Sequence, residues 1–207
     1  MQITRLSEIT IDKIKNRGLK KVLPELYKLE KIIENNGSHN NQPVFEHIIS
    51  VLTALDELLP GVNQRIKNYL AEKIDAYSRK QLLFLATILH DIGKGETMKR
   101  DGNTVSFPSH EAIGSEKLEI ILPRLDLSEK ERKIVMKTIK NHGFFHNLLD
   151  QRANLDLNQK ISEFREMNPD IFYEVVLLTK ADLLGGHLMK NKPEEFNFRM
   201  DFLIKIT

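Results

Sequence analysis

The spacing of apolar residues is the feature that most constrains this fold. They recur every three or four positions along nearly the whole chain, and alternating β-branched runs are scarce. This is the period of an amphipathic α-helix, so we predict an all-α protein. A chain of 207 residues with 41% hydrophobic residues can bury a core without cross-links. Neither a linker nor an internal repeat marks a border, so we expect one domain over residues 1–207.

Capping residues, prolines and glycines divide the helical pattern into segments. Two capping boxes, at Ser78–Gln81 and Ser128–Glu131, mark helix starts. A polar loop is predicted over residues 37–42, and residues 98–107, around Asp101-Gly102, are the one strand-like candidate, a small hairpin or a mobile lid. The helices are predicted over residues 7–16, 19–36, 43–59, 62–77, 78–93, 109–122, 128–142, 157–167, 170–190 and 193–204.

Several polar side chains occupy positions that the helical period assigns to the core. They are His47, His90, Asp91, His142 and Asp182. A buried carboxylate costs several kcal/mol unless a cation compensates it, and no lysine or arginine shares these faces closely enough to serve both aspartates. A divalent metal ion would compensate them. The chain has no cysteine, so histidines and carboxylates must hold that ion, which favours Mn, Fe, Co, Ni or Zn over calcium.

Each of these residues also has an ordinary explanation. A single histidine on an apolar face is most often a core residue with a protein partner. Asp182 alone would serve equally well as a cap for a neighbouring helix or as a partner of Lys180. The adjacent pair His90-Asp91 at the end of an all-apolar helix is harder to explain in this way, because both side chains can reach one ion there. The combination, and no residue by itself, predicts a metal site.

His47, then His90-Asp91 within the run His90 to Lys94, and finally Asp182 resemble the H…HD…D signature of the HD-domain metal-dependent phosphohydrolases. The chain is similar in particular to the HD region of bacterial tRNA nucleotidyltransferases and poly(A) polymerases, through residues 23–26, 39–47, 89–94 and 101–111. The resemblance implies an HD helical bundle with its core over about residues 23–190 and accessory helices at both ends. An Asp-x-Asp pair is absent, so we expect a free-standing HD domain that does not polymerise nucleotides.

The resemblance implies hydrolysis of a nucleotide-type phosphomonoester or phosphodiester by metal-activated water. His47, His90, Asp91 and Asp182 would hold the first ion. His110 and His142 extend the pattern toward two-metal members of the superfamily and would complete a second site bridged by Asp91. His110 is alternatively a phosphate-binding residue at a helix N-terminus, and His142 alternatively a partner of a ligand. One ion and two ions both remain open.

Lys94 follows the pair His90-Asp91, at the point where the helix breaks. We expect it to neutralise a phosphate oxygen, and the alternative is a solvated lysine at the end of a helix. His39 is expected near the entrance of the site. His146 and His187 are expected at the surface or behind the ligands.

A non-catalytic module that binds RNA or a nucleotide, or docks onto a separate polymerase, is the competing hypothesis. The formal net charge is only +2, and the basic run that would support RNA binding has no interleaved aromatic residues. That run consists of Lys13, Lys15, Arg17, Lys20 and Lys21. Residues 1–16 lack the apolar stretch of a signal peptide, and no segment has the length and apolarity of a membrane span, so we expect a cytoplasmic protein. The substrate and the oligomeric state are not predicted.

Overall fold

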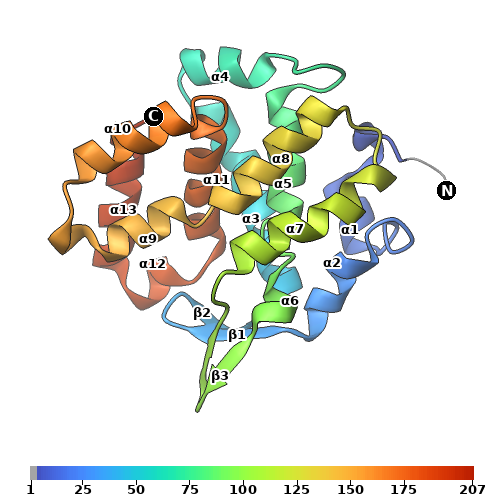
Figure 1. Cartoon of the computed structure of the whole chain (residues 1–207). Helices are drawn as coiled ribbons and strands as arrows, with labels where there is room; N and C mark the ends of the chain where they lie inside the picture. The colour runs from blue at the N-terminus through green and yellow to red at the C-terminus, as the bar shows by residue number, and fades with distance from the viewer. Residues whose placement is uncertain (1–3) are drawn as a thin grey trace.

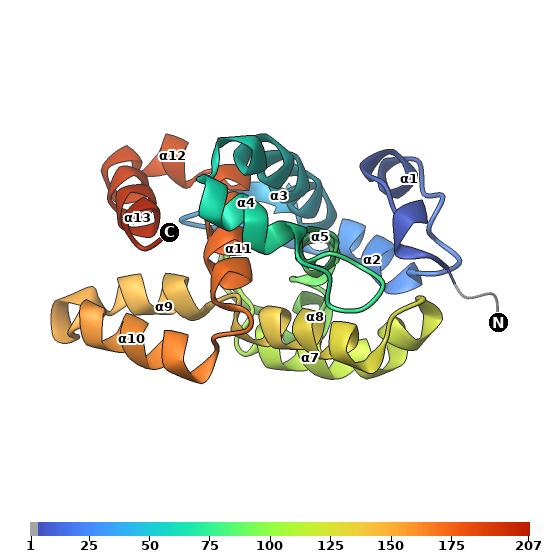
Figure 2. The same ribbon diagram turned by 90° about the horizontal axis from the view of Figure 1, so that it is seen from above.

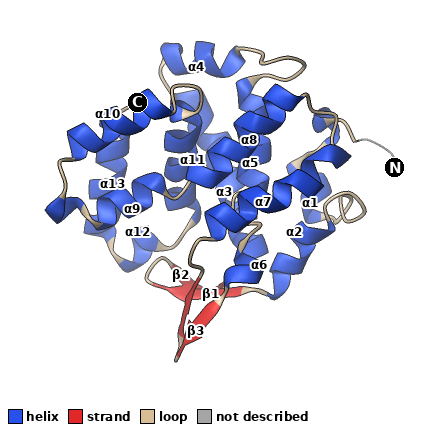
Figure 3. Cartoon of the chain, viewed as in Figure 1, coloured by secondary structure: helices blue, strands red, loops and turns tan. Residues whose placement is uncertain are grey.

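The structure is a computed structural model that describes residues 4–207. Residues 1–3, which belong to the predicted domain and to the segment compared with a signal peptide, lie outside the described residues. It is helical apart from two small antiparallel hairpins (Figure 3). The α-helices are α1 (Ile11–Lys15), α2 (Pro24–Lys28), α3 (Val44–Leu58), α4 (Gln64–Ala71), α5 (Arg79–Leu89), α6 (Lys94–Thr97), α7 (His110–Ile121), α8 (Glu129–Asn141), α9 (Phe144–Asp150), α10 (Leu157–Met167), α11 (Phe172–Gly185), α12 (Leu188–Asn191) and α13 (Pro193–Lys205).

Short 3₁₀ turns lie between several of the helices: η1 (Leu6–Glu8), η2 (Leu29–Lys31), η3 (Leu59–Gly61), η4 (Leu122–Arg124) and η5 (Arg152–Asn154). The strands are β1 (Ile33–Asn36), β2 (His39–Pro43), β3 (Lys99–Asp101) and β4 (Thr104–Ser106). The prediction of an all-α fold with a hairpin near residues 98–107 is confirmed. Both capping boxes are also confirmed, because the side chains of Ser78 and Ser128 each accept a hydrogen bond from the backbone N–H three residues later, and their own backbone N–H groups donate to the side chain of that residue.

The prediction for residues 19–42 holds only in its middle. The helix expected over residues 19–36 runs from Pro24 to Lys28 with a 3₁₀ turn to Lys31, and Ile33 begins strand β1, which pairs with β2 in the segment expected to be a loop. The spacing of apolar residues did not predict this strand, because the buried side chain of β1 is the charged Glu34, which forms ion pairs with Lys94 and His39. The turn signal was present, since Asn-Gly is typical of hairpins, and here it joins β1 to β2 at Asn36-Gly37.

Other predicted boundaries also differ from the structure: the helices expected over residues 7–16 and 62–77 are shortened to Ile11–Lys15 and Gln64–Ala71, and two more differences lie near the site. Helix α9 was not anticipated, because the sequence pattern ends one helix at His142-Gly143 and predicts the next only from Leu157. The helix predicted over residues 170–190 is divided into α11 and α12 at Gly186, where the backbone becomes extended. Both differences affect the site, because α9 and α12 contribute to its walls.

The centre of the molecule is formed by α11 packed along α3, with α5 against both (Figures 1 and 2). Helices α7 and α8 lie together on one side of this centre, and Figure 2 shows α9 and α10 as a separate pair beside α11. The central helices are the most apolar, and the buried side chains of α11 surround its whole circumference. The hairpin β3–β4 projects from the body next to β1 (Figure 1).

Gly185 allows α11 to approach α3 closely. A Cβ atom at this position would lie 2.7 Å from the backbone nitrogen of Val51 on α3, so a larger residue would force the helices apart. His47 stands one turn before Val51, and Asp182 stands about one turn before Gly185. The close approach therefore sets two polar side chains opposite each other.

Among residues 4–207, no helix combines the length and apolar character that a bilayer crossing requires. The cytoplasmic location expected from the sequence stays a prediction.

Candidate metal centre

His47 on α3 and Asp182 on α11 face each other in the core. The Nε2 atom of His47 lies 2.8 Å from Oδ1 of Asp182, and the imidazole is 1% exposed. The Nδ1 atom of His47 has no hydrogen-bond partner among the described residues. Burial lowers the pKa of His47 although Asp182 opposes this shift, so the ring is neutral and suited to bind a metal.

His90 and Asp91 follow the last residue of α5 and lie at the centre of the cluster. Both side chains are 1% exposed. The chain turns sharply at Gly93, where a Cβ atom would lie 2.2 Å from the carbonyl oxygen of His110 and would collide with it. This contact brings the start of α7 against the end of α5, and as a result Nε2 of His110 lies 3.4 Å from Oδ1 of Asp91.

Three of the histidines are oriented in the same way. The Nδ1 atoms of His90, His110 and His142 lie 2.8, 2.9 and 2.7 Å from the carbonyl oxygens three residues earlier in each case. A carbonyl can only accept a hydrogen bond, so each Nδ1 is a donor and each Nε2 is left as the potential ligand atom. The Nε2 atoms of His110 and His142 lie 3.2 Å apart, and a metal ion bound by both would stabilise this arrangement.

The potential ligand atoms form two groups whose members all lie within 4.8 Å of one another: His47, His90 and Asp182, and Asp91, His110 and His142. Asp91 joins the groups. Its Oδ2 lies 3.1 Å from His90, and its Oδ1 faces His110 and His142 at 3.4 and 3.9 Å. Ligand atoms bonded at about 2.0–2.2 Å to one transition-metal ion lie roughly 3–4 Å apart, so these separations fit such an ion.

The Nε2 atom of His90 is buried where the groups meet and has no hydrogen-bond partner among the described residues, whereas Oδ2 of Asp91 is ion-paired with Lys94. Burial raises the pKa of Asp91, but His90 and Lys94 outweigh this effect and hold the pKa well below its usual range, so the carboxylate is ionised. Burial, together with His110 and His90, lowers the pKa of His142 well below its usual value. An unpartnered imidazole nitrogen, an ionised carboxylate and a neutral imidazole form a donor set that suits a divalent transition metal.

Lys94 stands beside the cluster, and its Nζ lies 2.8 Å from Oδ2 of Asp91. From the sequence, no lysine or arginine is expected to serve both aspartates, and of the two Lys94 pairs with Asp91 alone. The same ammonium donates a hydrogen bond to Glu34 and lies 5.2 Å from the centre of the Phe107 ring. Asp182 lies outside its reach and contacts histidines instead. The predicted contact of Lys94 with a phosphate stays a prediction.

Two further residues contact the ligand groups. His146 was expected at the surface or behind the ligands, which agrees with its contact with Asp182, whereas Glu34 was not singled out from the sequence. His146 on α9 places Nε2 2.8 Å from Oδ2 of Asp182, on the opposite side from His47. Glu34 on β1 contacts Lys94 and places Oε2 2.9 Å from Nε2 of His39, whose ring packs edge-on against His47. A turn signal at Asn36-Gly37 was available to locate β1, whereas nothing local in the sequence relates His146 to Asp182.

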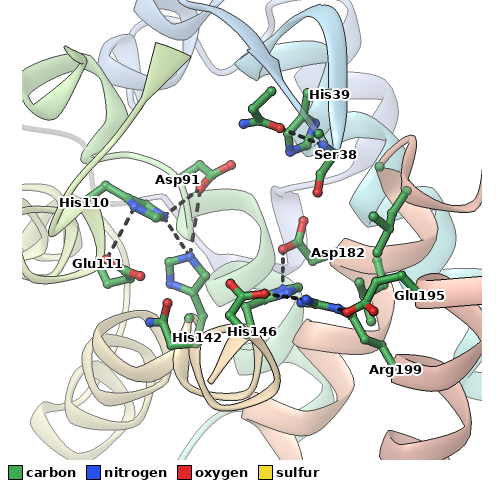
Figure 4. Close-up of a pocket in the computed structure, with 18 of the residues that line it drawn as sticks. Ser38, His39, Asp91, His110, Glu111, His142, His146, Asp182, Glu195 and Arg199 are labelled. Carbon is green, nitrogen blue, oxygen red and sulfur yellow. Dashed lines mark hydrogen bonds and ion pairs between the residues drawn. The ribbon is translucent and has the colours of Figure 1, made fainter. Parts of the chain in front are cut away.

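A cavity of about 580 Å³ opens onto the metal-binding groups. Figure 4 shows Asp91, His110 and His142 at one side of it, with Asp182 and His146 in the middle. His39 and Lys94 also line it, as expected for His39. Residues 98–107 do not line the cavity, so the hairpin predicted as a possible lid does not cover it in this structure.

The structure thus brings together every residue that the sequence proposed as a ligand, in the two groups described above. His187 lies close by on the chain and donates its backbone N–H to Ser38, which holds α12 to the β1–β2 hairpin.

A sequence model of the HD domain family matches residues 44–184. The A-adding tRNA nucleotidyltransferase of Deinococcus radiodurans is 30% identical over 151 residues, which are 72% of this chain and 30% of that protein. The bifunctional uridylyltransferase/uridylyl-removing enzymes of Zymomonas mobilis and Rhodospirillum rubrum are 28% identical over 154 residues and 26% identical over 146 residues. This chain spans 15% and 14% of their lengths. These matches confirm the predicted resemblance, and the chain corresponds to a minor part of each relative.

Proposed function

This chain belongs to the HD domain family, and from that premise we propose that it is a metal-dependent phosphohydrolase that cleaves a nucleotide-type phosphomonoester or phosphodiester with water. The observation that carries the proposal is the set of histidine Nε2 atoms that face Asp91, in rings that backbone carbonyls orient through Nδ1. Such an arrangement is costly without a cation and orients ligands when one is bound. Mn, Fe, Co, Ni and Zn all suit this donor set.

The charge around the cluster supports two ions over one. Four carboxylates, those of Glu34, Asp91, Glu111 and Asp182, stand against the single ammonium of Lys94 when the histidines are neutral. One divalent ion leaves this centre negative, which would repel a phosphate, whereas two make it positive. Asp91 is the residue placed to serve both, since its two oxygens face different groups.

Bound divalent ions lower the pKa of water and polarise a phosphate oxygen, which is the chemistry that ester hydrolysis needs. The chain itself positions these elements. The carbonyls of Thr87, Phe107 and Ile139 fix the imidazole rings. We propose that Lys94 holds the Asp91 carboxylate in place and offsets its charge, since Lys94 already contacts two carboxylates. His110, which is less buried than His142, lies on the side open to substrate.

Nucleotides are the proposed substrate class because the relatives' names refer to tRNA nucleotide addition and to uridylyl removal. The cavity volume lies in the range of sites that hold molecules of this size. Nucleoside monophosphates, 2′,3′-cyclic nucleotides and dinucleoside polyphosphates are the candidates to screen.

The first experiment compares the wild type with Asp91→Asn, which keeps the shape of the side chain and removes its charge. Metal content is measured by elemental analysis, and hydrolysis of bis(p-nitrophenyl) phosphate is followed with each candidate metal. We expect loss of bound metal and a fall in kcat/KM of about a hundredfold or more. Asp12→Asn, an exposed change on α1, is the control. Unchanged metal content and rate in Asp91→Asn would refute the proposal, and nucleotide or RNA retention without turnover in the wild type would favour the non-catalytic alternative.

Elemental analysis of two further variants tests the number of bound ions. His110→Ala and His142→Ala each remove one side chain from the second group only. We expect about two equivalents of metal per chain in the wild type and about one in each variant. A ratio near one throughout would show that the centre is mononuclear.

A further inference from the structure

The cavity has a second charged end that the metal-binding groups do not use. It is formed by α9, the turn after it and the start of α13. Figure 4 shows Glu195 and Arg199 on the far side of His146 and Asp182 from Asp91. The charged residues at this end are Asp150, Arg152, Lys192, Glu195 and Arg199. The last three lie beyond residue 184, where the match to the HD domain family ends.

Positive charge exceeds negative charge at this distal end. Glu195 contacts both Arg152, at 2.8 Å, and Arg199, at 2.7 Å, so one carboxylate serves two guanidinium groups. Asp150, the other carboxylate, pairs with Arg199, and its side chain is 62% exposed. Lys192 is exposed and forms no ion pair with the described residues. An anionic ligand would therefore meet an unbalanced positive charge here.

Arg199 is held in place with donors to spare. Its Nε donates to Glu195 and its Nη2 donates to Asp150, and the side chain is only 10% exposed. Its Nη1 makes no hydrogen bond within residues 4–207, yet it is not among the polar atoms sealed from solvent. Because Arg199 lines the cavity, an anion inside the cavity can approach its guanidinium group. A guanidinium fixed by two carboxylates with free N–H groups loses little entropy when it binds a phosphate.

We propose that the distal end is a second anion subsite, which takes a phosphoryl group remote from the one at the metal centre. Arg199 and Lys192 are its specificity-determining residues. The cavity of about 580 Å³ can hold a nucleoside between its two ends. The proposal rests on the function proposed above and narrows its substrate class to nucleotides that carry phosphates at both ends, such as a 3′,5′-bisphosphate.

The experiment compares adenosine 3′,5′-bisphosphate with adenosine 5′-monophosphate. Binding to the metal-loaded protein is measured by calorimetry, and the recovered nucleotides are checked by chromatography. If either nucleotide is hydrolysed, the preference is taken from the ratio of the two kcat/KM values instead of the ratio of the two Kd values. We expect the wild type to prefer the bisphosphate by about tenfold or more, the size of one charge-assisted contact. Arg199→Gln and Lys192→Gln are each expected to reduce this preference at least about threefold.

Lys190→Gln is the matched control, because Lys190 is exposed on α12, two residues before Lys192, and does not line the cavity. It makes the same change in net charge and should keep the full preference. Equal binding of both nucleotides by the wild type, or a preference that survives in both variants, would overturn the subsite. Hydrolysis of bis(p-nitrophenyl) phosphate, which has no second anionic group, reports on the proposed function separately, so the two proposals fail independently.

Discussion

At the scale of single residues, Glu34 connects parts of the site that do not touch each other. Its carboxylate contacts Lys94, which in turn contacts Asp91, and it contacts His39, whose ring centre lies 4.5 Å from that of His47. Burial raises the pKa of Glu34, but Lys94 and His39 outweigh this effect and the pKa lies below its usual value. Glu34 is therefore an ionised group that orients neighbours of both ligand groups.

The substitution Glu34→Gln is expected to weaken metal binding by about 10–100-fold, the usual effect of losing a partner that orients ligands. The amide keeps the volume of the side chain but removes the charge that pairs with Lys94. Competition with a chromophoric chelator measures the affinity. Glu57→Gln, on the exposed face of α3, serves as the control. An affinity equal to that of the wild type would mean that Glu34 only fills space.

Most of the ligands were predictable because they stand on or beside a helix whose other inward residues are apolar, so that a polar side chain is conspicuous. His110 was proposed only from the family resemblance. Asp182 among Val175 and Leu178 is the clearest example. Glu34 and His146 were not predictable in this way. Glu34 lies on a short strand without apolar alternation, and His146 acquires its contact only when α9 folds against α11.

At the scale of elements, the distance between α3 and α11 sets the geometry of the first ligand group. The substitution Gly185→Ala places a methyl group 2.7 Å from the backbone of Val51, which cannot move without moving α3. We expect a loss of about 1–3 kcal/mol of stability, as for other overpacked cores. We also expect weaker metal binding, because His47 and Asp182 would separate.

Thermal unfolding and metal titration measure the two effects of Gly185→Ala. Gly61→Ala is the matched control, since a Cβ atom at Gly61 meets nothing within 4 Å and its backbone is not left-handed. It should be neutral or slightly stabilising. Wild-type stability and metal affinity in Gly185→Ala would show that the helices can adjust and that their spacing does not determine the site.

Helical elements were predicted well where caps and periodicity agreed, as for α5 and α8 with their capping boxes and for α10. The β1–β2 hairpin was missed because its stability comes from distant partners. Asn191 of α12 hydrogen-bonds to Gly37 and to Asn40 across the hairpin, and such long-range contacts cannot be inferred from the amino-acid pattern of residues 33–43. A propensity for helix was overridden by tertiary contacts.

At the scale of the whole molecule, the residues of the two ligand groups come from helices that are far apart in the sequence. Figure 2 shows α3 and α11 in the centre, with α7 and α8 beside them. Residues of α3 and α11, those at the ends of α5 and α8, and the first residue of α7 meet at the site. A bound ion therefore acts as a cross-link between elements, and metal binding should be linked to global stability.

Removal of metal is expected to lower Tm for two reasons. An ion that binds only the folded state adds about 2.7 kcal/mol of stability when its free concentration is one hundred times Kd. For a chain of this size, this corresponds to a shift of roughly 5–10 °C. The metal-free protein also leaves the Nε2 atom of His90 buried without a hydrogen-bond partner, which costs free energy in the folded state.

The measurement is a pair of melting curves, after dialysis against a chelator and after re-addition of Mn²⁺, Co²⁺ or Zn²⁺. Tm should fall on dialysis and recover in proportion to the logarithm of free metal. The Asp91→Asn variant should lose most of this response, because it lacks the carboxylate that joins the two groups. Were its response equal to that of the wild type, the ion would be binding elsewhere. Were the wild-type curves to superimpose with and without metal, the buried histidines and carboxylates would be satisfied by one another, and the metal centre itself would have to be abandoned.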